Sequence, residues 1–212
     1  GYDFKILKEE PCCGEYIYSA GKKELAIKNF RKVHSLLKEQ GIKRLIVTCA
    51  GCLYAFREVY PKFIEDYDIE VKHVAQVIEG LVQAGDIQLQ DLGRTISYHD
   101  ACRMGRKLRE TEIYEEPRSL LKNSGLTVHE LEKKRNETPC CGAGSGIRGV
   151  DKNLCINIGS RILNEITTEE LASSCPLCVF NFRYVNFKNK MEKSSRYFTE
   201  YLLESMKKGE QA

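Results

Sequence analysis

The order of apolar and polar residues along the chain predicts short strands that alternate with amphipathic helices. Residues 21–40 repeat apolar side chains at helical spacing, and Gly41 follows as a helix stop. Residues 44–48 form a nearly continuous apolar run, which favours a buried parallel strand. We therefore expect an α/β fold in which small parallel sheets are flanked by helices. The apolar face of the first helix consists of Ala26, Phe30, Val33 and Leu37.

The same reasoning assigns the remaining elements. Strands are predicted over residues 3–7, 95–99, 126–131 and 171–174. Helices are predicted over residues 52–60 (ended by Pro61), 73–83, 117–125 (with Pro117 in its first position), 150–166, after Cys178, and 197–206. The helix over residues 150–166 is expected to bury Val150, Leu154, Ile158 and Ile162, which recur every four residues.

Composition narrows the class of protein. The chain has 212 residues, of which 42% are hydrophobic and 30% charged, as in ordinary globular domains. A net charge of +3 without a basic, aromatic tract gives no reason to expect nucleic-acid binding. No stretch approaches eighteen consecutive apolar residues, so we expect no membrane span and a cytoplasmic protein, or one attached to a membrane through a partner subunit.

Nine of the ten cysteines belong to two copies of one pattern. The second copy is a lone cysteine, an adjacent pair that opens a glycine-rich segment, and a Cys-x-x-Cys pair. The first copy has the adjacent pair and the Cys-x-x-Cys pair only. The members of the second copy are Cys102, Cys140, Cys141, Cys175 and Cys178, and those of the first are Cys12, Cys13, Cys49 and Cys52.

The spacing indicates an internal duplication. Cys12 and Cys140 are 128 positions apart, and Cys49 and Cys175 are 126 apart. We divide the chain into a first repeat over residues 1–92 and a second, complete repeat over residues 93–212. The counterpart of Cys102 would lie about 25 residues before Gly1 by the same offset, so the first repeat is expected to lack its leading segment.

The cysteines are better suited to metal than to disulfide bridges. Adjacent cysteines and Cys-x-x-Cys pairs rarely meet the geometry of an ordinary disulfide. Thiolates select zinc, copper(I) or iron–sulfur clusters, and zinc needs only four ligands. Five cysteines in the second repeat favour a larger iron–sulfur cluster, whereas zinc remains an alternative for the four of the first repeat. The predicted strand ends bring Cys49, Cys102 and Cys175 to one sheet edge.

Residues around the cysteines suggest supporting roles. Gly142 and Gly144 are expected to let backbone N–H groups approach the cluster. The run from Gly144 to Gly149 also matches a dinucleotide fingerprint, but no strand is predicted directly before it. His99 and Asp100 either tune a cluster or serve packing, and Cys155 is expected to be a buried apolar residue.

The segments Tyr98-His99-Asp100-Ala101-Cys102 and Thr138-Pro139-Cys140-Cys141-Gly142, with Cys175-x-x-Cys178, resemble the cysteine-rich CCG domain family. That family includes catalytic subunits of heterodisulfide reductase and iron–sulfur subunits of glycolate, lactate and glycerol-3-phosphate dehydrogenases. The resemblance implies one non-cubane [4Fe-4S] cluster per repeat, held by the cysteines named above. It covers nearly the whole chain as one complete repeat and one shortened repeat.

The resemblance implies an iron–sulfur oxidoreductase that reduces a small-molecule disulfide of the coenzyme M and coenzyme B type. An electron-donating partner is implied as well, either a ferredoxin-like subunit or a flavin or haem subunit. Two alternatives stay open. One is an electron-transfer subunit of a hydroxyacid or glycerol-3-phosphate dehydrogenase, and the other is a structural zinc–cysteine module for subunit assembly.

Overall fold

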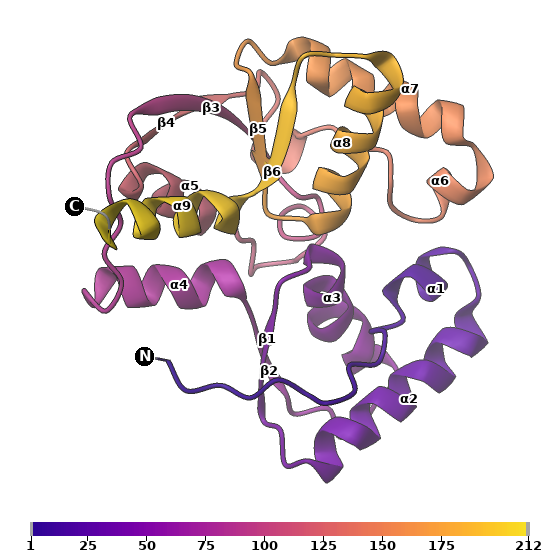
Figure 1. The fold of residues 1–212 in the computed structure, drawn as a ribbon. Coiled ribbons are helices and arrows are strands. Elements are labelled where there is room, and N and C mark those ends of the chain that lie inside the picture. Colours follow the sequence, from indigo (N-terminus) through magenta and orange to yellow (C-terminus); the bar gives the residue numbers. More distant parts are fainter. Residues whose placement is uncertain (1, 211–212) are drawn as a thin grey trace.

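The computed structural model of the chain describes residues 2–210. All strand pairs are parallel, in two sheets (Figure 1). The strands are β1 (Arg44–Val47), β2 (Glu70–His73), β3 (Arg94–His99), β4 (Leu126–Glu130), β5 (Glu170–Ser173) and β6 (Ser194–Tyr197). The helices are α1 (Glu15–Ser19), α2 (Lys23–Glu39), α3 (Ala50–Tyr54), α4 (Val74–Gln83), α5 (Glu115–Asn123), α6 (Ile147–Val150), α7 (Lys152–Glu165), α8 (Pro176–Asn189) and α9 (Phe198–Glu210). Three further helical turns are η1 (Ala55–Val59, a π-helix), η2 (Tyr60–Lys62, 3₁₀) and η3 (Arg135–Glu137, 3₁₀).

Two units of the same kind make up the structure, as the α/β prediction requires. The first has the sheet β1-β2, and the second has the sheet β4-β3-β5-β6. The order β1, α3, β2, α4 in the first unit recurs as β5, α8, β6, α9 in the second. Within residues 2–210 the first unit has no counterparts of β3 and β4, so β1 pairs with β2 alone. The division at residue 92 into two repeats stays a prediction.

The two units share their apolar cores. One core joins Phe30 and Leu53 of the first unit to Met104 and Leu163 of the second, and it includes several of the cysteines. The other core packs α4 against the second sheet, through Ala75 of α4 and Ile96 of β3. Helix α4 directly follows the first sheet but packs against α5 of the second unit, and α5 in turn packs against α9. The halves are therefore fixed to one another by burial of apolar side chains.

Several predicted elements differ from the structure. Residues 3–7 form no strand, and strands β2 and β6 were not predicted because their sequences lack an apolar run. The helix after Cys49 does not end before Pro61, which lies inside the 3₁₀ turn η2. Pro117 is the third residue of α5 instead of the first.

The helix predicted over residues 150–166 is broken at Asp151, which caps α7 by accepting the N–H of Leu154 at 2.9 Å. The predicted apolar face is wrong by about one residue. Val150 is 90% exposed and Leu154 46% exposed, so neither belongs to the core. The buried face of α7 consists of Cys155, Gly159, Ile162 and Leu163.

A buried arginine holds the segment before the second cysteine pair. Arg118 of α5 donates to both oxygens of Asp100 at 2.7 Å and to Glu130 at 2.7 and 2.9 Å. Asp100 also accepts from the Arg135 N–H at 2.8 Å and from the Thr138 hydroxyl at 3.3 Å. Because Arg118 and Asp100 are 1% and 3% exposed, each charge depends on the other for compensation.

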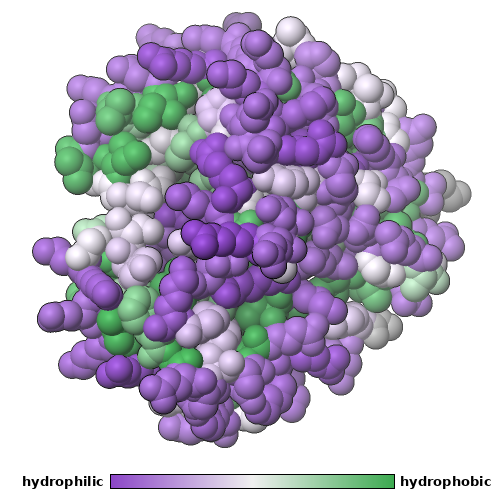
Figure 2. All heavy atoms as spheres, turned by 180° about the vertical axis from the view of Figure 1, so that it is seen from behind, coloured by the Kyte–Doolittle hydropathy of each residue, from purple (hydrophilic) through white to green (hydrophobic). Residues whose placement is uncertain are grey.

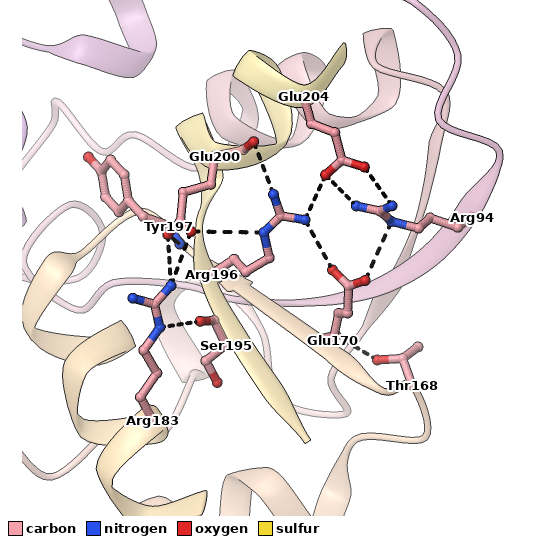
Figure 3. Close-up of polar contacts among 9 residues, drawn as sticks. All are labelled: Arg94, Thr168, Glu170, Arg183, Ser195, Arg196, Tyr197, Glu200 and Glu204. Carbon is pink, nitrogen blue, oxygen red and sulfur yellow. Dashed lines mark hydrogen bonds and ion pairs between the residues drawn. The ribbon is translucent and has the colours of Figure 1, made fainter. Parts of the chain in front are cut away.

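A second network fastens α9 to the other end of the sheet (Figure 3). Arg94, the first residue of β3, donates to both oxygens of Glu204 at 2.8 Å. Arg196 of β6 donates to the same carboxylate at 2.8 Å. Arg183 of α8 pairs with Glu200 at 2.9 Å, and both side chains are about half exposed. These surface pairs connect α8, α9, β3 and β6 at a modest gain each.

No helix in the described part of the chain is long and apolar enough to cross a membrane. Figure 2 shows a mostly hydrophilic face, with apolar residues gathered toward its upper left.

The buried arginine gives a test of stability. We expect Arg118→Leu to lower the free energy of unfolding by roughly 3–5 kcal/mol, because it leaves the negative charge of Asp100 buried without its cationic partner. Arg183→Gln removes an exposed pair and should cost less than about 1 kcal/mol. Urea denaturation followed by circular dichroism measures the free energy of unfolding of both variants. Equal losses of stability would contradict the larger role assigned to the buried pair.

Candidate metal centre

The two adjacent cysteine pairs fold into the same turn. Gly14 and Gly142, which follow them, have φ angles of 78° and 92°, a region that favours glycine. The Gly14 N–H lies 3.5 Å from the Cys12 sulfur, and the Gly142 N–H lies 3.4 Å from the Cys140 sulfur. A Cβ on Gly142 would come within 3.0 Å of the Cys155 carbonyl oxygen. Each turn therefore directs one backbone donor at a sulfur.

The two Cys-x-x-Cys pairs are also equivalent. Cys49 follows β1 and Cys175 follows β5, and both are extended residues that cap the next helix. Their carbonyl groups accept the N–H groups of Leu53 at 2.9 Å and Val179 at 3.1 Å. Cys52 and Cys178 lie in the first turn of those helices. Cys102 and Cys175 follow strands of one sheet, as predicted, but Cys49 follows β1 of the other sheet, so the predicted single sheet edge is wrong for Cys49.

Eight thiols form a continuous row through both units. In it, each thiol is close enough to the next to shift its pKa, and Cys49 of the first unit neighbours Cys175 of the second. The order is Cys13, Cys52, Cys49, Cys175, Cys178, Cys141, Cys140 and Cys102. The remaining predicted ligand, Cys12, is exposed.

Because the thiols lie close together, the pKa of some of them is lowered and that of others is raised. Hydrogen bonds from Cys175 and Cys52 lower the pKa of Cys49 to about 2, and those from Cys102 and Cys141 lower the pKa of Cys140 to about 2. The hydrogen bond to Cys140 and then burial raise the pKa of Cys102. Neighbouring thiolates repel, so the row cannot ionise fully unless cations replace its protons.

The donor set fits soft metal ions, because every member of the row is a sulfur. Within residues 2–210, no three His, Cys, Asp or Glu side chains converge as they would around a single ion. The sulfurs follow one another in a row instead.

Side chains outside the cysteine pattern hold the two turns. Asn181 of α8 donates to the Cys141 carbonyl at 2.7 Å and accepts the Cys155 thiol at 3.0 Å. In the first unit, Asn29 donates to the Cys12 carbonyl at 2.8 Å and Tyr60 to the Cys13 carbonyl at 3.0 Å. None of the three was predicted from the sequence. A polar residue inside the apolar run of α8 was the available signal for Asn181.

His99 and Asp100 have different roles. Asp100 belongs to the Arg118 network described above. His99 is buried, its Nε2 lies 3.0 Å from the Pro139 carbonyl oxygen, and its Nδ1 has no partner. Burial lowers the pKa of His99, so the ring is neutral at pH 7. Its contact with Pro139 supports the residue directly before Cys140.

Equivalent residues of the two units meet beside the junction of the row. His73 ends β2 and Tyr197 ends β6, and the Tyr197 hydroxyl lies 3.5 Å from His73 Nε2. Tyr197 also donates to the Thr48 carbonyl at 2.5 Å. Burial lowers the pKa of His73 to about 4, so this ring is neutral at pH 7. His73 and Tyr197, like Cys49 and Cys175, occupy equivalent positions in the two units and lie next to each other where the units meet.

The two glycines expected to approach a cofactor lie beside the row. Gly142 directs its N–H at Cys140, in agreement with the geometry expected. A Cβ on Gly144 would lie 2.6 Å from Nη1 of Arg103, so this glycine leaves room for a side chain. Contact of either glycine with a cofactor stays a prediction.

Comparisons with known proteins agree on one family. The profile of the cysteine-rich domain family CCG matches residues 1–57 and 96–183. One subunit of the dihydromethanophenazine:CoB–CoM heterodisulfide reductase of Methanosarcina barkeri is 31% identical over 195 residues, covering 85% of this chain and 46% of that protein. The EtfAB:quinone oxidoreductase of Syntrophomonas wolfei is 29% identical over 191 residues, covering 84% of this chain and 26% of that protein. A probable iron–sulfur-binding oxidoreductase of Bacillus subtilis, FadF, is 32% identical over 166 residues, covering 74% of this chain and 22% of that protein.

These matches confirm the resemblance seen in the sequence. The relatives are a heterodisulfide reductase subunit, a quinone oxidoreductase and a probable iron–sulfur-binding oxidoreductase. The chain spans about half the length, or less, of the curated relatives it matches.

The row of thiols can be tested by substitution. If each unit holds one iron–sulfur centre, Cys141→Ser should remove about half of the iron and acid-labile sulfide taken up on anaerobic reconstitution, because the second-unit centre loses a ligand. Cys155→Ser, which keeps the hydrogen bond to Asn181, should load normally. Equal loading of the two variants would remove Cys141 from the ligand set.

Asn181 should matter to both stability and loading. Asn181→Leu leaves the Cys141 carbonyl without its donor, so we expect a loss of about 1–3 kcal/mol in the free energy of unfolding and slower uptake of iron. Asn189→Leu, which removes an exposed contact with Ser160, should change stability by less than about 0.5 kcal/mol. Urea denaturation and timed reconstitution measure the two effects.

Proposed function

Because this chain belongs to the cysteine-rich CCG domain family, we propose that it is an iron–sulfur oxidoreductase subunit that reduces a small-molecule disulfide. The reaction is R–S–S–R′ + 2 e⁻ + 2 H⁺ → R–SH + R′–SH. A bound iron–sulfur cluster supplies single electrons, and the protein supplies geometry and charge. The substrate class proposed is a heterodisulfide of the coenzyme M and coenzyme B type.

The neighbouring position of Cys49 and Cys175, which follow equivalent strands of the two units, supports the proposal. These two cysteines would be one ligand of each proposed centre. The two sulfurs of a disulfide are only about 2 Å apart, so paired electron sources must be close together to serve both. Four thiols of the row, Cys13, Cys141, Cys175 and Cys178, are buried, and the exclusion of water strengthens the interaction of a thiolate with cations.

Each unit would hold one non-cubane [4Fe-4S] cluster. In the second unit the ligands proposed are Cys102, Cys140, Cys141, Cys175 and Cys178. In the first unit they are Cys12, Cys13, Cys49 and Cys52, with zinc as the alternative occupant. The Gly14 and Gly142 N–H groups already point at sulfurs, and such donors raise the potential of a cluster.

A second candidate is electron relay without disulfide chemistry. The similarity to EtfAB:quinone oxidoreductase supports it, since the name of that protein describes electron passage to a quinone. A relay would use the same two sets of thiols as successive stations. In either case we propose an electron-donating partner subunit, of ferredoxin-like, flavin or haem type. We propose a cytoplasmic location, with membrane attachment through a partner, because one relative is a probable membrane-anchored ferredoxin.

Metal analysis and two assays separate the candidates. Protein prepared anaerobically should contain iron and acid-labile sulfide, and zinc without sulfide would overturn the redox proposal. With a reduced viologen as donor, the protein and its partner subunit should reduce the coenzyme M–coenzyme B heterodisulfide. Hydroxyacid-dependent reduction of a quinone analogue, without heterodisulfide activity, would favour the relay instead.

A further inference from the structure

Arg103 of the second unit reaches across to the first. Its Nη2 forms an ion pair with Glu15 of α1 and donates to the hydroxyls of Ser19 at 2.9 Å and Ser145 at 3.1 Å. The Arg103 and Glu15 side chains are only 13% and 7% exposed. Among the ion pairs of the described residues, this one alone joins the two units.

Two glycines show that the Arg103 side chain passes between the metal-binding turns. A Cβ on Gly144 would lie 2.6 Å from Arg103 Nη1. A Cβ on Gly51 would lie 3.6 Å from the Cys49 sulfur and 3.9 Å from Arg103 Cδ. Leu177 occupies the position equivalent to Gly51 in the second unit. The space that Gly51 leaves for the Arg103 side chain therefore exists beside the Cys-x-x-Cys segment of the first unit and has no equivalent in the second.

The guanidinium of Arg103 lies beside the second cysteine turn, because it approaches Gly144 and donates to the Ser145 hydroxyl, and Arg103 itself directly follows Cys102. Burial works against its charged form, but Glu15, Cys102, Cys175 and Cys140 raise the pKa of Arg103 overall. The three thiols in that group all belong to the second set. A buried positive charge is poorly screened, so its effect on these neighbours is large.

Reduction of a cluster adds one electron and hence one negative charge, and no bond forms or breaks. We infer that Arg103, partly offset by Glu15, makes the second-unit centre easier to reduce than the first-unit centre. Arg103 is a positioning residue, since it acts through the thiolates. The inference rests on the proposed binding of a cluster by the second set.

Opposite charge changes provide the test. The whole chain, reconstituted anaerobically with iron and sulfide, is titrated potentiometrically and followed by visible absorption and electron paramagnetic resonance. Cys13→Ser identifies which potential belongs to the first unit. Arg103→Gln should shift the second-unit midpoint to a more negative value, and Glu15→Gln should shift it to a more positive value. Arg103→Lys, which keeps the charge, should stay near wild type, as should the exposed control Lys107→Gln.

The outcomes are distinct. Shifts of both neutral variants in the same direction, or no shift with normal loading, would overturn this inference alone. A wild-type chain that takes up no iron and sulfide would overturn the proposed function as well. If Arg103→Gln fails to fold, Glu15→Gln alone tests the inference. That variant removes the negative charge that offsets Arg103, so the midpoint potential of the second-unit centre must rise.

Discussion

Repulsion between thiolates crowded at the border of an apolar core is the constraint on which the rest of the structure depends. Eight neighbouring thiols can carry full charge only when cations join them, so the polypeptide must hold them in place before any metal arrives. It does so with rigid local devices, namely glycine turns, strand ends and side chains that bind the turn carbonyls. Asn181 donates to the Cys141 carbonyl and Tyr60 to the Cys13 carbonyl, and these hydrogen bonds hold the backbone of the two cysteine turns in place.

The outer scaffold serves the same end. The Arg118–Asp100 pair anchors the segment that leads into Cys140, while the ionic network on α9 closes the far end of the second sheet. Packing of α4 against the second unit fixes the first sheet relative to the second. Because the halves share their cores, the position of Cys49 beside Cys175 is set by burial of apolar surface far larger than the sulfur contact itself.

Much of this arrangement could be predicted from the sequence. The predicted strands over residues 44–48, 95–99 and 171–174 placed three cysteines at strand ends. The family followed from the resemblance of the segments around the cysteines. Strands β2 and β6 escaped prediction because Glu70-Val71-Lys72-His73 and Ser194-Ser195-Arg196-Tyr197 gain their structure from pairing. The buried face of α7 was misplaced because Asp151 restarts the helix. The contact between the two sets arises from docking of the units, which no local pattern encodes.

That contact also orders events during synthesis of the chain. Cys49 and Cys175 are 126 positions apart, so the first set leaves the ribosome long before its neighbour exists. Contacts of such long range form late in folding. Until then Cys13, Cys49 and Cys52 lack the second unit that covers one side of them, and exposed thiolates are open to oxidation. An oxygen-poor compartment, or a chaperone that covers newly made thiols, would protect these three cysteines from oxidation until the second unit has folded.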